Sequence, residues 1–282
     1  MSDCIPFIFR PIAEDNNTIT GDIRIGESAT VHSPVLLILH GFKGFKDWGF
    51  FPYVAEYFAL EGFITITVNF SLNGYRPNSD RIEAPEDFHH NTISREIQET
   101  LALIEALQAG TLHPSLHEYA NNPLYILGHS RGGGIALAAA ARSSHIMKAI
   151  IWNSVATFDR FTPRQKQLWA ESGAFPVENA RTGQALSLGL EYLQDITENE
   201  LSISPVAMAA QLHHTPLLIV HAEQDMTVPL REAHKLLYSS SARAQLHVIA
   251  RTGHTFGAVH PFQGSTPALD EALAVTTDFL KQ

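Results

Sequence analysis

The strongest constraint on the fold is an alternation of short apolar runs with segments of helical periodicity. β-branched and other apolar residues dominate six runs, at residues 35–40, 63–70, 124–127, 149–152, 217–221 and 245–249. Nearly continuous apolar character marks several of these runs as strands buried on both faces, which is typical of parallel sheets. Strands that alternate with helices predict an α/β fold, in which helices flank a mostly parallel central sheet.

The beginning of the chain departs from this alternation. Residues 7–12 and 18–25 flank the turn-rich segment Glu14-Asp15-Asn16-Asn17. Asp and Asn suit tight turns because their side chains hydrogen-bond to nearby backbone. We therefore expect an antiparallel hairpin at the edge of the sheet.

Helices are indicated by spacing and by residues that begin or end them. Apolar residues recur at helical spacing over residues 92–108, and Gly110 follows as a stop. Residues 132–142 are rich in alanine, which predicts a helix packed closely on the sheet. For the last helix, Ser265 or Thr266 is the expected cap and Pro267 suits the first turn.

The length of 282 residues and the 45% hydrophobic content suffice for one substantial core, so we expect a single domain over residues 1–282. The alternation breaks down between Trp152 and Thr215, a far longer gap than the usual connection of roughly 2–6 residues. We expect a cap insertion at about residues 159–213. Residues 163–172 resemble a helix, and a β-hairpin is expected after Thr182-Gly183, where apolar residues alternate with smaller or polar ones at Leu186, Leu188, Leu190 and Tyr192.

Charge and cysteine content limit the partners and the location. The 19 Lys and Arg against 29 Asp and Glu give a net charge of −10, which repels phosphate backbones and anionic lipid. We expect neither nucleic acid nor a membrane as partner. Cys4 is the only cysteine and the first residues lack a secretory signal pattern, so we expect a cytoplasmic location. No feature of the sequence defines the oligomeric state.

The motif Gly128-His129-Ser130-Arg131-Gly132 has the form G-x-S-x-G, and it stands between a predicted strand and a helix of small residues. A serine nucleophile on such a strand-to-helix turn needs neighbours without side chains, because the turn is very tight. Ser130 is therefore the candidate nucleophile, close to a helix N-terminus that favours developing negative charge. The competing interpretation is an ordinary serine in a glycine-rich loop.

A serine hydroxyl needs a base within hydrogen-bond reach, and the base needs an acid to orient it. His254 follows the last apolar run and is the candidate base, although a surface histidine is the alternative in a chain with 15 histidines. Asp225 follows the run at 217–221 and is the candidate acid, since the order Ser130, Asp225, His254 is that of a known hydrolase fold. Asp159 is the rival acid, and a turn aspartate is the other interpretation of Asp225.

Two backbone N–H groups are needed to stabilise an oxyanion. Arg131 directly follows the nucleophile and supplies one, and we expect Phe42 to supply the other from the loop after residues 35–40, with Lys43 as the fallback. Phe70 and Trp152 follow strand ends and are, with Lys43, candidate residues of the substrate pocket. Core packing is the alternative for the aromatic side chains.

Two histidine pairs, His89-His90 and His213-His214, resemble metal ligands at first sight. Neither pair has a Cys, Asp or Glu at a recognisable ligand spacing. We expect solvated histidines and no metal site.

The segments LLILHGF, ILGHSRGGGIAL, LLIVHAEQDMTVP and RTGHTF resemble the α/β-hydrolase superfamily, and within it the dienelactone-hydrolase-like and peptidase-like esterase branches. The resemblance runs from about Val35 to the C-terminus, apart from the cap. It implies a Ser-His-Asp acyl-enzyme mechanism without a metal or organic cofactor. True dienelactone hydrolases typically have a cysteine where this chain has Ser130, and the HGGG oxyanion motif of another esterase branch is absent.

The leading expectation is hydrolysis of a small-molecule carboxylic ester through an acyl-Ser130 intermediate, with His254 transferring the protons. A peptidase or amidase is the second expectation, since it can use the same three residues. A non-catalytic, ligand-binding member of the same fold is the third.

Overall fold

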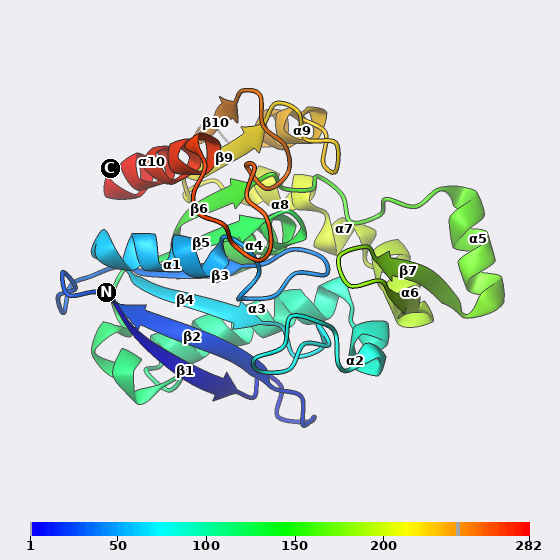
Figure 1. The fold of residues 1–282 in the computed structure, drawn as a ribbon, viewed down its shortest axis with the longest axis horizontal. Helices are drawn as coiled ribbons and strands as arrows, with labels where there is room; N and C mark the ends of the chain where they lie inside the picture. Colours follow the sequence, from blue (N-terminus) through cyan, green and yellow to red (C-terminus); the bar gives the residue numbers. More distant parts are fainter. Residues whose placement is uncertain (1, 241–242) are drawn as a thin grey trace.

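A computed structural model describes residues 2–240 and 243–282. Its main sheet has eight strands in the order β1-β2-β4-β3-β5-β6-β9-β10 (Figure 1). The strands are β1 (Asp3–Phe9), β2 (Ile19–Ile25), β3 (Val35–Leu39), β4 (Ile64–Asn69), β5 (Leu124–His129), β6 (Ile146–Trp152), β9 (Leu217–Ala222) and β10 (Ala244–Ile249). All neighbours from β4 to β10 pair in parallel. The predicted mostly parallel sheet is confirmed, and so is the antiparallel hairpin of β1 and β2 at its edge.

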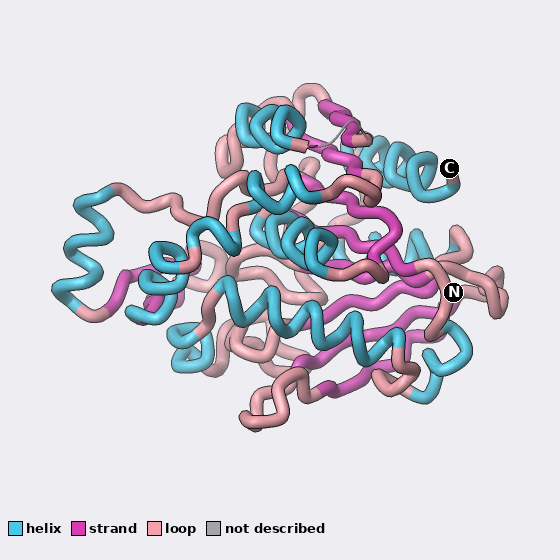
Figure 2. Tube along the Cα trace, turned by 180° about the vertical axis from the view of Figure 1, so that it is seen from behind, coloured by secondary structure: helices cyan, strands magenta, loops and turns pink. Residues whose placement is uncertain are grey.

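The central strands are buried because helices cover both faces of the sheet. Every residue of β3, β4, β5 and β9 is buried. Successive strand side chains point to opposite faces, so Leu36 and Ile38 pack with α1 (Phe51–Leu60) and α10 (Pro267–Lys281). Leu37 and Leu39 pack in the other core, with α3 (Ile93–Gln108), α4 (Arg131–Arg142), α8 (Pro205–Gln211) and α9 (Arg231–Ser239). Figures 1 and 2 show the two helical layers from opposite sides.

The predicted helix ends follow from local capping. The side chain of Thr92 accepts a hydrogen bond from the N–H of Arg95 at the start of α3, and Thr266 accepts one from Leu269 at the start of α10. Such caps satisfy backbone donors that have no partner inside the helix. Two further short elements lie between β4 and β5, the helix α2 (Pro85–His90) and a 3₁₀ helix (Pro114–Tyr119). Within the described part of the chain, no helix is both long and apolar enough to cross a lipid bilayer.

The segment between β6 and β9 holds a small second sheet and several helices. These are α5 (Pro163–Ser172), the antiparallel pair β7 (Ala174–Asn179) and β8 (Gln184–Gly189), α6 (Leu190–Glu198) and α7 (Glu200–Ile203). Figure 1 shows α5, α6 and β7 projecting to one side of the main sheet. The structure has a helix at 163–172 and a hairpin around Gly183, as the sequence predicted. We refer to residues 159–204 as the insertion.

Two details of this segment differ from the expectation. Leu190 and Tyr192 lie in α6 rather than in a strand, because the helix begins after Gly189 and buries Tyr192, Leu193 and Ile196 at helical spacing. Helix α8 falls inside the expected cap range of 159–213, but it packs on α4 and α9. It is the crossover helix that the parallel strands β6 and β9 require, so the insertion ends before it.

Candidate active site

Ser130 stands on the tight turn between β5 and α4. Its backbone has φ 59° and ψ −121°, a conformation that residues other than glycine rarely adopt. A Cβ built on Gly128 would lie 2.1 Å from the carbonyl oxygen of Gly132, and a Cβ on Gly132 would lie 2.4 Å from that of His40. The close packing of backbone on backbone therefore requires glycine at both positions, and it holds Ser130 at the carboxyl edge of the sheet.

The fold brings Ser130, His254 and Asp225 together from three distant segments. His254 Nε2 lies 3.0 Å from Ser130 Oγ, and His254 Nδ1 lies 2.6 Å from Asp225 Oδ2. A carboxylate only accepts hydrogen bonds, so Nδ1 carries the proton and Nε2 is left to accept from the serine hydroxyl. The three side chains form a continuous hydrogen-bonded chain that ends at a hydroxyl.

The environment of Asp225 favours its ionised form. Burial would raise the pKa of this carboxyl group, but hydrogen bonding and the charge of His254 outweigh burial and hold the pKa below its ordinary value. The N–H groups of Thr227 and Val228 each donate to Asp225 Oδ1 at 2.8 Å. A fixed negative charge therefore faces His254.

Asp159, the rival acid, lies in a different environment. Its carboxylate accepts hydrogen bonds from Lys166 Nζ at 2.6 Å and from the N–H of Phe161 at 3.3 Å. It thereby links the beginning of the insertion to α5. The structure brings Asp225, rather than Asp159, to His254.

Two further residues hold the loop that carries His254. The backbone oxygen of His254 accepts a hydrogen bond from His129 Nε2 at 2.9 Å and one from Asn153 Nδ2 at 2.7 Å. Asn153 Oδ1 accepts from the N–H of Ala222 at 2.7 Å, so this fully buried amide connects the ends of β6 and β9 with the loop. Asn153 was not predicted as a site residue, although its position directly after a strand was a signal.

Two buried histidines near the site are held neutral. Burial lowers the pKa of His129 to about 3, with repulsion from His254 as a smaller cause. Burial likewise lowers the pKa of His40 to about 4. His40 Nδ1 donates to the carbonyl of Gly41 at 2.9 Å, so His40 braces the loop after β3. Neither residue is placed to replace His254 at the serine.

The loop after β3 passes very close to Ser130. A Cβ on Gly41 would lie 2.9 Å from Ser130 Cβ and 3.3 Å from its Oγ, so the backbone approaches the hydroxyl directly. Phe42, next along this loop, and Arg131, the first residue of α4, line one cavity with Ser130. The guanidinium of Arg131 stacks on the Phe42 ring at 4.7 Å and pairs with buried Glu96 at 2.5 Å. The two predicted oxyanion positions are thus in contact through their side chains.

Two cavities meet at Ser130 and His254. The first has a volume of about 370 Å³ and a mostly apolar wall, to which the segment after β6 and the insertion contribute Val155, Phe158, Phe161, Leu188 and Tyr192. The second has a volume of about 300 Å³ and is lined in part by Trp48, Phe51, Asn179 and Arg181. Residues of the insertion could not be assigned to a wall from sequence, because they reach it through tertiary packing.

Lys43 lines both cavities, but the other two predicted pocket residues do not. Its ammonium group donates to the carbonyl of Glu178 in β7, which joins the loop after β3 to the insertion. Phe70 is buried in the core against the ring of His40, with 5.1 Å between the centroids. Trp152 is fully buried and donates from Nε1 to Thr276 in α10. Both face the core because a residue at a strand end still points to one face of the sheet.

The family of the chain follows from residues 36–266, which match the model of the alpha/beta hydrolase family. The chain belongs to this family, as the fold and the strand-to-helix turn at Ser130 indicate. A search of curated proteins gave no match.

Solved structures share the fold over nearly the whole chain. A putative hydrolase from Agrobacterium vitis S4 has 18% identity and a TM-score of 0.71, with 99% of this chain and 98% of that one covered. Est1E from Butyrivibrio proteoclasticus with ferulic acid bound has 17% identity and a TM-score of 0.72, with 97% of each chain covered. A dienelactone hydrolase from Anabaena variabilis ATCC 29413 has 15% identity and a TM-score of 0.62, with 99% and 97% covered. At these identities the likeness shows the fold alone.

Proposed function

We propose that this protein hydrolyses a carboxylic ester of a small molecule through an acyl-Ser130 intermediate. The observation that carries the proposal is the hydrogen-bonded chain from Asp225 through His254 to Ser130. Membership of the alpha/beta hydrolase family supports it. Est1E, a structural relative, was solved with ferulic acid bound, and this supports a small organic molecule as the substrate proposed here.

The proposed reaction begins when His254 Nε2 takes the proton of the Ser130 hydroxyl as Oγ attacks the ester carbon. The N–H groups of Phe42 and Arg131 stabilise the resulting oxyanion. His254 then returns the proton to the leaving alkoxide, and the acyl group remains on Ser130. A water molecule, deprotonated by His254, releases the acid and restores the serine. Asp225 fixes the tautomer of His254 and stabilises the imidazolium.

The two cavities divide the substrate between them. We assign the acyl chain to the first cavity, because its apolar wall matches a hydrocarbon, and the alcohol to the second. Leu188 and Tyr192 of the insertion form part of the wall of the first cavity. The insertion therefore acts as a cap over the active site of a single domain, and it limits the size of the acyl group that fits.

A fluorophosphonate probe tests the nucleophile directly. The probe should label the wild-type chain at Ser130, and Ser130→Ala should remove labelling and nearly all esterase activity with little change in Tm. Ser202→Ala, a change at an exposed serine of α7, is the control and should be labelled normally. Normal turnover of an ester by Ser130→Ala would overturn the proposal. Matched p-nitrophenyl ester and p-nitroanilide substrates then separate an esterase from an amidase.

A further inference from the structure

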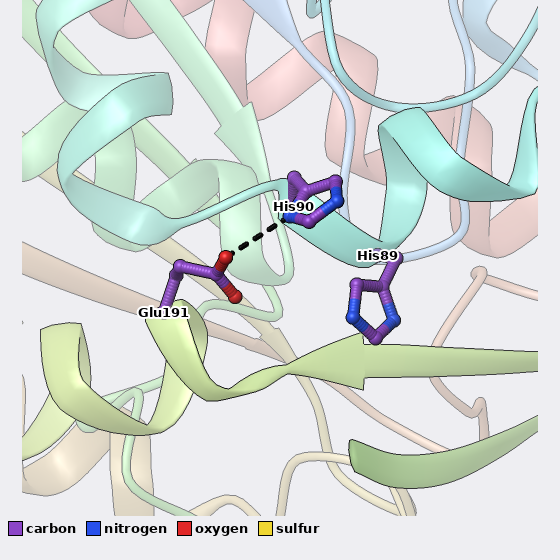
Figure 3. A group of neighbouring side chains, drawn as sticks. All are labelled: His89, His90 and Glu191. Atoms are coloured by element: carbon purple, nitrogen blue, oxygen red, sulfur yellow. Dashed lines mark hydrogen bonds and ion pairs between the residues drawn. The ribbon is translucent and has the colours of Figure 1, made fainter. Parts of the chain in front are cut away.

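Three side chains that commonly bind metals meet between α2 and α6 (Figure 3). His89 and His90 end α2, and Glu191 lies in the first turn of α6. One possible ligand atom from each residue lies within 4.8 Å of the other two, and no other such group occurs in residues 2–240 or 243–282. No acidic partner was predicted for these histidines because Glu191 lies 101 residues from His90 along the chain.

Neighbouring residues orient His89 toward this group. Its Nδ1 is hydrogen-bonded to Ser187 Oγ at 2.8 Å, which leaves Nε2 available as a ligand atom. Histidines that bind metals commonly use their second nitrogen in this way. A Cβ on Gly189 would lie 2.4 Å from Glu191 Oε2 and 2.9 Å from His89 Nε2. Because residue 189 is glycine, the space between these two ligand atoms is not filled by a side chain.

His90 and Glu191 are hydrogen-bonded to each other. His90 Nδ1 lies 3.1 Å from Glu191 Oε1, and both side chains are about half exposed. Zinc binds nitrogen and oxygen atoms at about 2.0–2.2 Å, so two ligand atoms of one tetrahedral ion lie about 3.3–3.6 Å apart. The ligand atoms here lie within 4.8 Å of one another, so the widest pair is at most about 1.5 Å too far apart for a tetrahedral ion. Rotation of the half-exposed side chains of His90 and Glu191 toward His89 closes this difference.

We propose that His89, His90 and Glu191 bind a zinc ion that joins α2 to the insertion. Two imidazoles and one carboxylate are a donor set that Zn²⁺ takes with a water molecule in the fourth position. Mg²⁺ and Ca²⁺ prefer sites made entirely of oxygen and fit this set poorly.

The proposed zinc site lies directly behind the first cavity. Phe88 precedes His89 and stacks on Phe42, with 5.6 Å between the ring centroids. Leu188 and Tyr192, on either side of Gly189 and Glu191, form part of the cavity wall. Bound zinc therefore fixes this wall against α2. The effect on substrates depends on the proposed function, but zinc binding itself does not.

Binding of Zn²⁺ alone to the metal-free full chain, measured by calorimetry or by competition with a chromophoric chelator, tests the site. We expect saturable binding of one ion, which Glu191→Gln and His90→Ala weaken by more than about 100-fold. Ser187→Ala should weaken it by about 10–100-fold, as losing the residue that orients a ligand does elsewhere. Co²⁺ should give the strong visible absorption of a tetrahedral site in the wild type and lose it in Glu191→Gln.

Two control variants separate this site from other binding. His213→Ala/His214→Ala removes an exposed histidine pair outside the group and should leave the affinity unchanged. Ser130→Ala should also bind zinc normally, so that a failure of the proposed esterase activity leaves the metal test intact. Equal affinity in wild type, Glu191→Gln and His90→Ala, or the absence of saturable binding, would overturn the proposal. Unchanged Tm values of the metal-free variants show that they are folded.

Discussion

The side-chain amide of Asn153 donates a hydrogen bond to the backbone oxygen of His254 at 2.7 Å. The same amide accepts from the N–H of Ala222, so three loops at the carboxyl edge of the sheet share one buried group. Through this contact Asn153 sets the position of the imidazole relative to Ser130, although it does not touch the proposed reacting atoms.

Replacing Asn153 by alanine should lower kcat by at least tenfold while changing KM little. The change leaves the buried N–H of Ala222 without its partner, at a cost of about 1–3 kcal/mol, and frees the loop of His254. Asn122→Ala is the matched control, because this amide donates to Val31 and Ser33 far from the site. The control should lower Tm and leave kcat unchanged. Equal losses of kcat in both variants would assign Asn153 a purely structural role.

Asp225→Asn should lower kcat by about 10⁴, the loss found when the acid of a well-studied triad is replaced in this way. An amide in this position can donate to His254 and so allows the wrong tautomer, and it no longer stabilises an imidazolium. Asp159→Asn should stay within about tenfold of wild type, or about 1.4 kcal/mol in the barrier, because its partner is Lys166. Both variants are compared on the same ester at the same pH. The opposite ranking would transfer the role to Asp159.

The buried histidines predict a loss of stability on acidification. The folded-state pKa of His129 is about 3 and that of His40 about 4, whereas the unfolded value is about 6.5. Between these values the unfolded chain binds more protons, so the free energy of unfolding falls as pH drops below about 6.5. Each histidine contributes roughly 1 kcal/mol per pH unit in this window.

Urea unfolding at several pH values between 7 and 5 measures this slope. His129→Gln keeps a donor in place of Nε2 and removes one titrating group, so its stability should depend less steeply on pH. The exposed His117→Gln should have the wild-type slope. If the His129 variant retained that slope as well, the neutral state assigned to His129 would be incorrect.

Leu188→Phe should shift the preference of the enzyme toward short acyl groups. The larger side chain occupies part of the first cavity, where one methylene of substrate is worth about 1–3 kcal/mol. We expect the ratio of kcat/KM for a long-chain ester to that for an acetate ester to fall at least tenfold. Leu201→Phe, an exposed change on α7, is the control and should leave the ratio unaltered. An unchanged ratio in Leu188→Phe would mean that the acyl chain does not bind in this cavity.

The features that could be predicted from sequence are those set by residues near one another in the chain. Thr92 and Thr266 cap helices within a single turn, and Gly128 and Gly132 enclose Ser130 within five residues. The order of strands and the chain positions of Asp225 and His254 were enough to bring these two residues to the same edge.

The features that could not be predicted depend on which face a side chain takes or on contacts across the fold. Trp152 ends a strand at the correct edge but points into the core, because its register in β6 decides its direction. Glu191 becomes a neighbour of His90 only when the insertion folds back on α2. No local sequence pattern gives the direction of the Trp152 side chain or the proximity of Glu191 to His90.

The turn that carries Ser130 is built from contacts between backbone atoms at Gly128, Gly132 and His40, and none of these contacts uses the serine hydroxyl. The turn therefore does not depend on the hydroxyl oxygen that makes the attack in the proposed mechanism. A side chain of similar size, such as cysteine, can stand at residue 130 without any other part of the turn being rebuilt. Within this turn the proposed nucleophile can be exchanged, whereas the two glycines cannot.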